Sequence, residues 1–343
     1  MEASLYERME DSKVNCNLCN HRCVIKNGRR GICGVRENRE GTLISLVYGK
    51  IIAEHIDPIE KKPLFHLAPG SLSYSIATAG CNFKCRFCQN ADIAQMPADR
   101  EGLIIGNPRS PEEIVAAALS AGCQSIAYTY TEPTIYFEFA YDTAKLAQKA
   151  GLKNVFVTNG YMSSEALHRI HPYLDAANVD LKSFSEDFYK TYCGAKLNAV
   201  KETLVLMKRL GILVEVTTLL IPGLNTDSGE LKQLASFIAG SLGTDTPWHI
   251  SRFHPTYRLT DRPPTPVDTL IKVRKIGIEA GLKYVYMGNV PGENGENTSC
   301  PACGKNLIDR WGFRVKKNRI KNGACPACGH VIVGIDMDSR ENK

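Results

Sequence analysis

Three cysteines stand close together in the segment Ala-Gly-Cys-Asn-Phe-Lys-Cys-Arg-Phe-Cys-Gln-Asn. Thiolates with this Cys-x3-Cys-x2-Cys spacing can ligate three corners of a cubane iron–sulfur cluster. No fourth cysteine stands at a matching distance, and an open coordination position is typical of a catalytic metal site. We therefore interpret Cys81, Cys85 and Cys88 as catalytic residues that hold a [4Fe-4S] cluster with one iron free for a substrate.

A zinc knuckle is the alternative interpretation of this loop. Zinc would need a fourth ligand, and neither cysteine nor histidine occurs between Cys88 and Cys123. The apolar run 71–79 predicts a strand directly before the loop. The C-terminal end of a strand is where a (β/α) fold places its chemistry, so the sequence favours a catalytic cluster.

Four further cysteines lie within the first 35 residues, in the pattern Cys-x2-Cys-x3-Cys-x9-Cys. Several glycines punctuate the segment, which predicts a loop built around a metal rather than packed secondary structure. Four thiolates form a closed site, so its role is structural or electron-transferring. Zinc and a second iron–sulfur cluster both fit this pattern, and the uneven nine-residue last gap slightly favours zinc. His21 is interpreted as a histidine of the loop rather than as a ligand. The predicted ligands are Cys16, Cys19, Cys23 and Cys33.

The C-terminal region repeats the segment Cys-Pro-Ala-Cys-Gly. Two Cys-x2-Cys pairs about 20 residues apart are typical of a zinc ribbon. Two redox-active thiol pairs are the alternative, but the halves match each other and lie outside the strand–helix pattern. We expect one zinc ion, held by Cys300, Cys303, Cys325 and Cys328.

From residue 71 onward, apolar strands alternate with amphipathic helices. This alternation predicts a parallel sheet with right-handed crossovers, and about seven strands are too few for a closed eight-stranded barrel. The predicted class is α/β, an incomplete (β/α)6-type open TIM-like barrel. An N-terminal Cys-rich metal-binding extension and a C-terminal zinc ribbon flank it, giving domains 1–70, 71–291 and 292–343. Runs 42–48 and 50–56 predict a β-hairpin before the core. Core strands are expected at 71–79, 125–130, 153–158, 177–181, 212–220, 248–253 and 284–287.

Polar residues follow several of these strands, at the sheet edge where ligands gather in parallel open sheets. Glu132 offers a carboxylate to an ammonium group, with the start of the next helix and an interaction with its dipole as the alternative. Asn159 can hydrogen-bond a ribose or a carboxylate, and the adjacent Gly160 permits close approach. Asp180 and Lys182 share one face by strand alternation. They suit a ribose hydroxyl and a carboxylate, with a structural ion pair as the alternative.

The cysteine loop, with Phe87 before its last cysteine, resembles the radical S-adenosylmethionine (SAM) superfamily. The resemblance implies that the open iron binds SAM, and that an electron from the reduced cluster cleaves it to methionine and a 5′-deoxyadenosyl radical. It implies that Phe87 lies near the adenine and that Glu132 binds the amino group of SAM. Thr-Asn-Gly at 158–160 and Asp-Leu-Lys at 180–182 look like SAM-contacting segments of pyruvate formate-lyase activating enzymes. Asn289 ends the strand from which the family contacts adenine.

The flanking segments resemble radical SAM proteins of the AmmeMemoRadiSam system, which are pyruvate formate-lyase activase-like by sequence. Segments 16–23, 57–64 and 252–255 and the terminal ribbon carry this resemblance. It implies an oxidoreductase or transferase supplied by a donor such as flavodoxin or ferredoxin. Three outcomes stay open: hydrogen abstraction from a partner glycine, modification of another macromolecule, or addition of the radical to an unsaturated small molecule. His254 is expected to contact substrate or transfer a proton, with a core or capping role as the alternative.

Composition is that of a globular protein, 43% hydrophobic and 23% charged over 343 residues. No apolar run suggests a membrane span, and the first residues lack the features of a signal peptide. Thirteen cysteines without an export signal argue against disulfides, so we expect a cytoplasmic protein with no membrane association. The net charge of +6 leaves one other function class open, a metal-rich nucleic-acid-binding protein that uses the ribbon and basic tail.

Overall fold

The computed structural model describes residues 1–290 and 295–338. Within these residues, the centre of the molecule is an eight-stranded sheet in which seven strands run parallel and one edge strand, β7, runs antiparallel. In spatial order the strands are β15 (Val285–Gly288), β14 (Trp248–Arg252), β13 (Leu213–Leu220), β12 (Ala176–Asp180), β11 (Lys153–Thr158), β10 (Ser125–Tyr128), β8 (Leu72–Ala77) and β7 (Ala53–Pro58).

Every predicted core strand forms, with each end within two residues of the expected position. The sheet is open, because β15 and β7 form its two edges. The predicted α/β class with a mostly parallel sheet is therefore confirmed. Apolar strands recur because both faces of a parallel sheet are covered.

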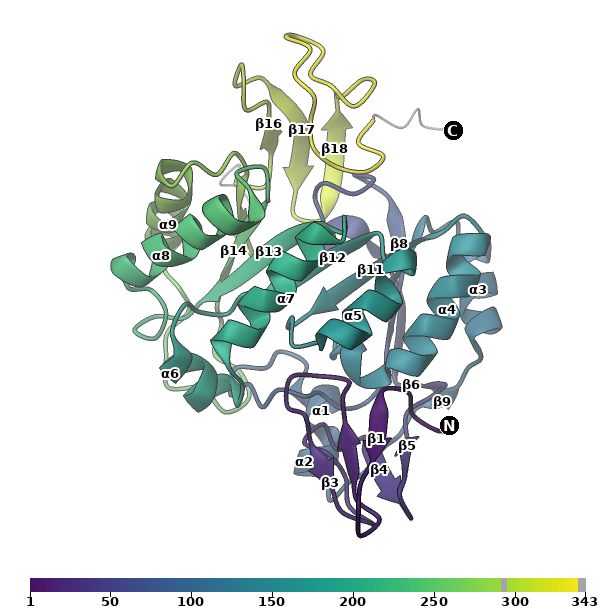
Figure 1. Cartoon of the computed structure of the whole chain (residues 1–343). Helices are drawn as coiled ribbons and strands as arrows, with labels where there is room; N and C mark the ends of the chain where they lie inside the picture. Colours follow the sequence, from purple (N-terminus) through teal and green to yellow (C-terminus); the bar gives the residue numbers. More distant parts are fainter. Residues whose placement is uncertain (291–294, 339–343) are drawn as a thin grey trace.

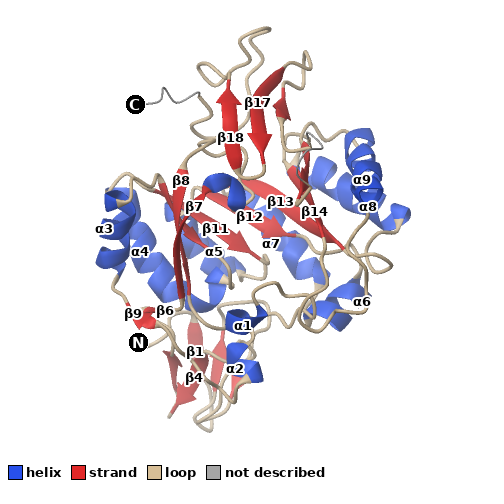
Figure 2. Cartoon of the chain, turned by 180° about the vertical axis from the view of Figure 1, so that it is seen from behind, coloured by secondary structure: helices blue, strands red, loops and turns tan. Residues whose placement is uncertain are grey.

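Helices connect the parallel strands. Of these, α4, α5 and α7 lie in front of the sheet in Figure 1 and behind it in Figure 2, so they cover the same face. The start of α3 has the capping box that its sequence predicts, because Ser110 and Glu113 each accept a hydrogen bond from the other's backbone. The helices are α1 (Ala91–Ala94), α2 (Met96–Asp99), α3 (Pro111–Ser120), α4 (Phe137–Lys149), α5 (Ser164–Ile170), α6 (Glu186–Phe188), α7 (Leu197–Arg209), α8 (Ser228–Phe237) and α9 (Val267–Glu279).

The predicted hairpin over 42–48 and 50–56 is wrong. The first run forms β5 (Thr42–Ser45), which pairs with β4 (Arg36–Arg39), while β7 from the second run pairs with β8 of the central sheet. The physical reason is that β8 would otherwise be an unpaired sheet edge, and β7 satisfies its backbone groups. Residues 53–58 thus belong to the core sheet rather than to the N-terminal extension.

The N-terminal segment, residues 1–52, carries short strands where a loop was expected. Three of them form an antiparallel sheet: β1 (Tyr6–Arg8), β2 (Val14–Cys16) and β3 (Val24–Ile25). Another, β6 (Lys50–Ile51), pairs with β9 (Asn107–Pro108). A buried ion pair between Arg36 and Glu138 fixes the segment to α4.

The C-terminal subdomain, residues 295–338, is an antiparallel sheet of β16 (Thr298–Ser299), β17 (Asn306–Trp311) and β18 (Arg314–Asn318). It lies at the opposite end of the molecule from the N-terminal segment (Figure 1). Fully buried Arg310 joins it to the core through Glu60 and the Phe65 carbonyl. The predicted domain boundary at 291/292 lies outside the described residues.

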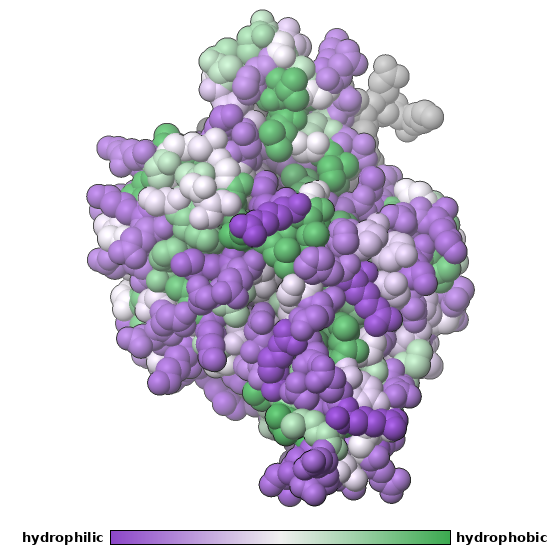
Figure 3. Space-filling model, in the orientation of Figure 1, coloured by the Kyte–Doolittle hydropathy of each residue, from purple (hydrophilic) through white to green (hydrophobic). Residues whose placement is uncertain are grey.

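Hydrophilic residues cover much of the face shown in Figure 3, with hydrophobic groups between them. In the described part of the chain, every helix is too short or too polar to cross a membrane.

Candidate active site

A cavity of about 500 Å³ lies at the C-terminal ends of the parallel strands. A larger hollow of about 890 Å³ beside α3 and α4 contains none of the predicted site residues. The smaller cavity gathers side chains from the cysteine loop and from the ends of several strands. Its lining includes nine predicted residues: Cys81, Cys85, Phe87, Cys88, Glu132, Asn159, Asp180, Lys182 and Asn289.

The cysteine loop runs between β8 and α1. Backbone hydrogen bonds join Lys84 to the Cys193 carbonyl at 2.8 Å and Arg86 to the Tyr192 carbonyl at 3.0 Å. Gly80 begins the loop with φ +103°, and a Cβ atom there would lie 2.6 Å from a methyl group of Val35. Only glycine fits this combination of backbone angle and close packing. The loop is therefore held in one conformation from both sides.

The three thiols of this loop lie in surroundings where a thiolate needs a bound metal. Burial, followed by the charge of Cys85, raises the pKa of Cys88 to about 11. Burial and nearby negative charge, including that of Glu132, raise the pKa of Cys81 well above its usual value. Thiols in such surroundings become thiolates only when cationic metal compensates their charge. This donor set suits thiophilic iron.

Glu132 is a buried carboxylate on the cavity wall, 2% exposed. One oxygen, Oε1, accepts hydrogen bonds from the Thr134 amide and hydroxyl and from the Thr158 hydroxyl, and Oε2 accepts one from the Asn159 amide at 2.8 Å. No ion pair involves Glu132 within the described residues. Burial raises its pKa, although these hydrogen bonds oppose the shift. Glu132 also caps the 3-10 helix Pro133–Tyr136, so the alternative role is present as well. An ammonium group in the cavity would find a preformed acceptor that has no cationic partner among the described residues.

Asp180 and Lys182 form the ion pair that was the alternative prediction, with Nζ and Oδ2 2.8 Å apart. Both nevertheless line the cavity. Burial alone would lower the pKa of Lys182, but Asp180 and nearby thiols raise it well above its usual value. The ammonium group also lies 5.9 Å from the ring centre of Phe87. The ion pair thus presents a fixed positive group beside an aromatic wall.

Asn159 supports the cysteine loop as well as lining the cavity. Its Nδ2 donates to the side-chain oxygen of Asn82 at 2.7 Å, and its Oδ1 accepts from the Tyr161 amide at 3.1 Å. Asn289 lines the cavity from the end of β15 and donates to the Arg252 carbonyl at 3.3 Å.

His254 lies elsewhere. Its side chain is exposed and is not among the residues that line the cavity. The structure therefore does not bring His254 together with the other predicted site residues, and its role in substrate contact stays a prediction.

The lining also includes residues outside the predicted set, among them Lys61, Tyr130 and Phe313. Tyr130 donates to Asp57 and has φ +61°. It lies between the end of β10 and Glu132, and that position at a strand end was the available signal. Phe313 belongs to the β17–β18 turn of the C-terminal subdomain, and nothing local in the sequence connects it to the cavity.

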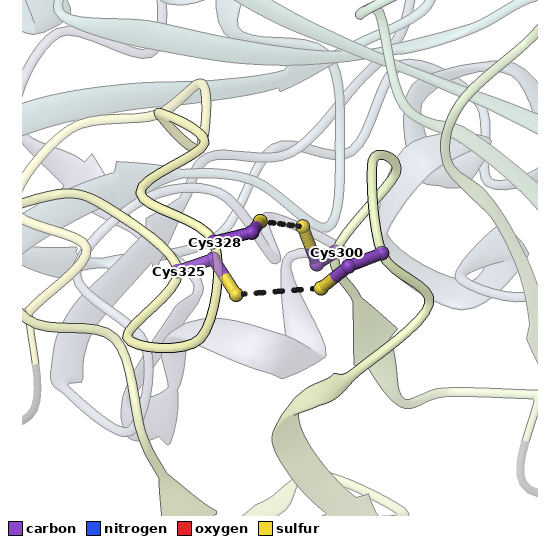
Figure 4. A group of neighbouring side chains, drawn as sticks. Cys300, Cys325 and Cys328 are labelled. Atoms are coloured by element: carbon purple, nitrogen blue, oxygen red, sulfur yellow. Dashed lines mark hydrogen bonds between the residues drawn. The ribbon is translucent and has the colours of Figure 1, made fainter.

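Four thiols gather in the C-terminal subdomain (Figure 4). The Sγ atoms of Cys300 and Cys328 are 3.6 Å apart, and those of Cys303 and Cys325 are 3.7 Å apart. Among residues 1–290 and 295–338, this is the one group in which three or more potential metal-ligating atoms of Cys, His, Asp or Glu lie within 4.8 Å of one another. The predicted ligands are thus brought together as a site that can hold a metal ion.

The four N-terminal cysteines do not form so tight a group. Cys16 is buried, and Cys19, Cys23 and Cys33 are half-buried. His21 Nε2 contacts the Asn82 carbonyl at 2.7 Å, which agrees with its interpretation as a loop histidine.

Comparison with known proteins agrees with this site. Residues 75–238 match the model of the radical SAM superfamily. The chain is 50% identical over 315 residues to the uncharacterized protein MJ0808 of Methanocaldococcus jannaschii, covering 92% of this chain and 93% of that protein. It is 23% identical over 220 residues to MJ1632 of the same organism, named as a candidate glycyl-radical enzyme activating enzyme, with 63% of this chain and 78% of that protein covered.

A solved structure also shares the fold. The radical SAM methyltransferase of Sphaerobacter thermophilus matches with a TM-score of 0.51 and 16% identity, over 69% of this chain and 71% of that chain. The chain belongs to the radical SAM superfamily, whose members bind SAM and a [4Fe-4S] cluster.

Proposed function

We propose that this enzyme binds SAM in the cavity beside the cysteine loop, cleaves it reductively and uses the resulting 5′-deoxyadenosyl radical on a separate substrate. The observation that carries the proposal is that three cysteine thiols and the unpaired carboxylate of Glu132 line one cavity. An iron–sulfur ligand set and an acceptor for an ammonium group are thereby adjacent. A site that only stores metal or only stabilises the fold does not need an acceptor for an ammonium group.

The proposed roles follow the lining residues. The cluster, held by Cys81, Cys85 and Cys88, supplies the electron for SAM cleavage. Glu132 accepts from the SAM ammonium group through Oε2, which has one protein donor where Oε1 has three. Lys182, held by Asp180, offers a cation to the SAM carboxylate.

The remaining roles concern the nucleoside part of SAM. Phe87 packs against the adenine, and Asn159 and Asn289 offer hydrogen bonds from the ends of β11 and β15. In the C-terminal subdomain, zinc is the proposed metal, because sulfur–sulfur distances of 3.6 and 3.7 Å match a tetrahedral site with Zn–S bonds of about 2.3 Å.

The three possible outcomes for the radical remain proposals. Resemblance to glycyl-radical activating enzymes supports hydrogen abstraction from a partner glycine. The C-terminal subdomain, through Phe313 on the cavity wall, gives the substrate a second surface to contact. A flavodoxin or ferredoxin is the proposed electron donor.

The test is anaerobic SAM cleavage by the reconstituted full chain with excess dithionite. We expect methionine and 5′-deoxyadenosine in equal amounts. Cys85→Ala should reduce their formation at least about 100-fold, because the cluster loses one of its three protein ligands. Cys123→Ala is the matched control, since this buried cysteine belongs to none of the three groups. Full activity of folded Cys85→Ala would overturn the assignment.

A nucleic-acid substrate is the second candidate. Trp311, Phe313, Arg314, Lys316 and Lys317 are exposed around the β17–β18 turn. Aromatic rings and cations together suit single-stranded nucleic acid. Binding of a labelled RNA that weakens about tenfold or more between 50 and 200 mM salt would support this candidate. Salt-independent or undetectable binding would remove it.

A further inference from the structure

The N-terminal cysteines occupy neighbouring turns of one small sheet. The amide of Cys16, at the end of β2, donates to the Cys23 carbonyl at 2.9 Å. The turn that carries Cys33 folds back over them, because a Cβ atom on Gly31 would lie 3.7 Å from the Cys23 sulfur. The Arg22 amide donates to the Cys19 carbonyl at 3.0 Å and closes the turn between Cys19 and Cys23. The turns that carry the four cysteines are thus packed together.

Their spacing differs from that of the C-terminal group. A single zinc ion with bonds of about 2.3 Å holds its four sulfurs about 3.8 Å apart. The C-terminal thiols meet this requirement, whereas no three of the N-terminal thiols lie within 4.8 Å of one another. The sulfurs of Cys81, Cys85 and Cys88 likewise do not form a group within 4.8 Å of one another. A cubane places each thiolate on a different iron atom and therefore separates its ligands further than one ion does.

We propose that Cys16, Cys19, Cys23 and Cys33 hold a second iron–sulfur cluster, rather than zinc, beside the SAM-binding loop. The chain itself provides the comparison, because its four C-terminal thiols form a compact group and its four N-terminal thiols do not. All four ligand positions are thiolates, so this cluster has no open iron and serves electron transfer.

The position of the group supports that role. His21, between the second and third ligands, contacts the carbonyl of Asn82, the neighbour of Cys81. The Cys33 carbonyl lies 3.2 Å from the position of a Cβ atom on Gly80, which precedes Cys81. The Asn20 amide donates at 3.0 Å to the Tyr161 carbonyl, in the loop after β11. The N-terminal group therefore packs directly on the two loops that line the SAM cavity.

The electron balance is simple. A reduced flavodoxin or ferredoxin loses one electron, the N-terminal cluster gains it, and no bond or proton changes. Cys19, Cys23 and Cys33 are only partly buried, which places this group near the protein surface that such a donor would contact. The use of this electron for SAM cleavage rests on the proposed function, whereas the identity of the metal at the N-terminal site does not.

The decisive experiment uses the full chain with Cys81, Cys85 and Cys88 all replaced by alanine, reconstituted anaerobically with iron and sulfide. We expect about four iron and four sulfide per chain, about one zinc, and an electron paramagnetic resonance signal after dithionite reduction. Two zinc and no iron would overturn the inference. Iron retained by the variant while the wild-type chain fails to cleave SAM would instead overturn the proposed function alone.

A second variant leaves Cys81, Cys85 and Cys88 unchanged, so a folding defect of the triple alanine variant cannot affect its result. Cys23→Ser in the otherwise unchanged chain should lower iron from about eight to about four per chain, with circular dichroism unchanged. It should also lower the ratio of flavodoxin-driven to dithionite-driven SAM cleavage at least about tenfold. An unchanged iron content would contradict the proposed ligand set. The matched control is Cys123→Ser, which should retain about eight iron.

Discussion

At the scale of single residues, Glu132 is a tightly held group on the cavity wall. Four hydrogen bonds fix its buried carboxylate, and none of the described residues forms an ion pair with it. Such a group is costly unless a ligand supplies the counter-charge. Binding of an ammonium group should therefore stabilise the fold around Glu132.

Glu132→Gln should weaken SAM binding about 10- to 100-fold, because a charge-assisted hydrogen bond contributes about 1.5–3 kcal/mol. Calorimetric titration of the cluster-loaded chain with SAM measures this change. Glu202→Gln, on the exposed face of α7, is the control and should bind as the wild-type chain does. A dissociation constant for Glu132→Gln within twofold of wild type, with the same melting temperature, would contradict the assignment.

Positions at strand ends could be predicted from sequence, because strand alternation and chain order decide which edge of a parallel sheet they reach. Glu132, Asn159, Asp180 and Lys182 all reached the cavity for this reason. His254 did not, since the chain after β14 turns outward and exposes it. The direction of a loop depends on its tertiary partners rather than on its own residues.

At the scale of elements, the attachment of the N-terminal segment to α4 holds the N-terminal cysteines beside the cysteine loop of residues 81–88. Arg36 is 1% exposed and pairs with Glu138, which also accepts hydrogen bonds from the Ser4 amide at 2.8 Å and hydroxyl at 2.9 Å. Removing one partner of a buried ion pair leaves the other charge unpaired in a poorly solvated site.

Glu138→Gln should destabilise the fold by about 3–5 kcal/mol, because Arg36 stays buried without its counter-charge. Urea denaturation at equal metal content measures this as a lower midpoint. The control Glu279→Gln removes an exposed α9 pair with a distance of 3.7 Å to Lys275, and it should change stability by less than about 1 kcal/mol. Equal midpoints for Glu138→Gln and wild type would show that the pair does not anchor the segment.

The same pair gives a pH dependence. Burial alone would raise the pKa of Glu138, but the Arg36 guanidinium lowers it below its usual value. A carboxyl group with a lowered folded-state pKa stabilises the fold above its unfolded pKa of about 4.3, and this contribution disappears as the pH falls through the folded-state value. The stability difference between wild type and Glu138→Gln should therefore be constant from pH 6 to 8 and shrink below about pH 4. A difference that grows on acidification would contradict this sign.

Element pairing was less predictable than element position. The strand pattern of residues 50–56 was recognisable, but its partner was not, because alternation specifies a face and not a neighbour. The availability of the β8 edge decided that β7 joins the central sheet. The short strands around the N-terminal cysteines were missed for a related reason, since glycines and cysteines carry little strand preference.

At the scale of the whole molecule, the C-terminal subdomain contributes Phe313 to the wall of the candidate active-site cavity. More than 200 residues separate Phe313 from the cysteine loop, and a sequence pattern holds no information on contacts of that range. The subdomain is positioned by Arg310, which is fully buried and donates to the Thr298 hydroxyl at 2.7 Å and the Phe65 carbonyl at 2.9 Å.

Arg310→Ala should release the C-terminal subdomain from the core, because buried Glu60 then loses its cation and Phe65 its stacked guanidinium, 4.2 Å away. A loss of about 3–5 kcal/mol corresponds to hydrogen exchange about 100-fold faster or more in β17 and at residues 59–66. Exchange in β11 and β12, at the centre of the sheet, should not change. Arg314→Ala, at an exposed position of β18, is the control and should leave protection intact. Faster exchange throughout the sheet would mean that the subdomain is part of one folding unit with the core, and unchanged exchange in β17 would show that Arg310 does not position Phe313 at the cavity.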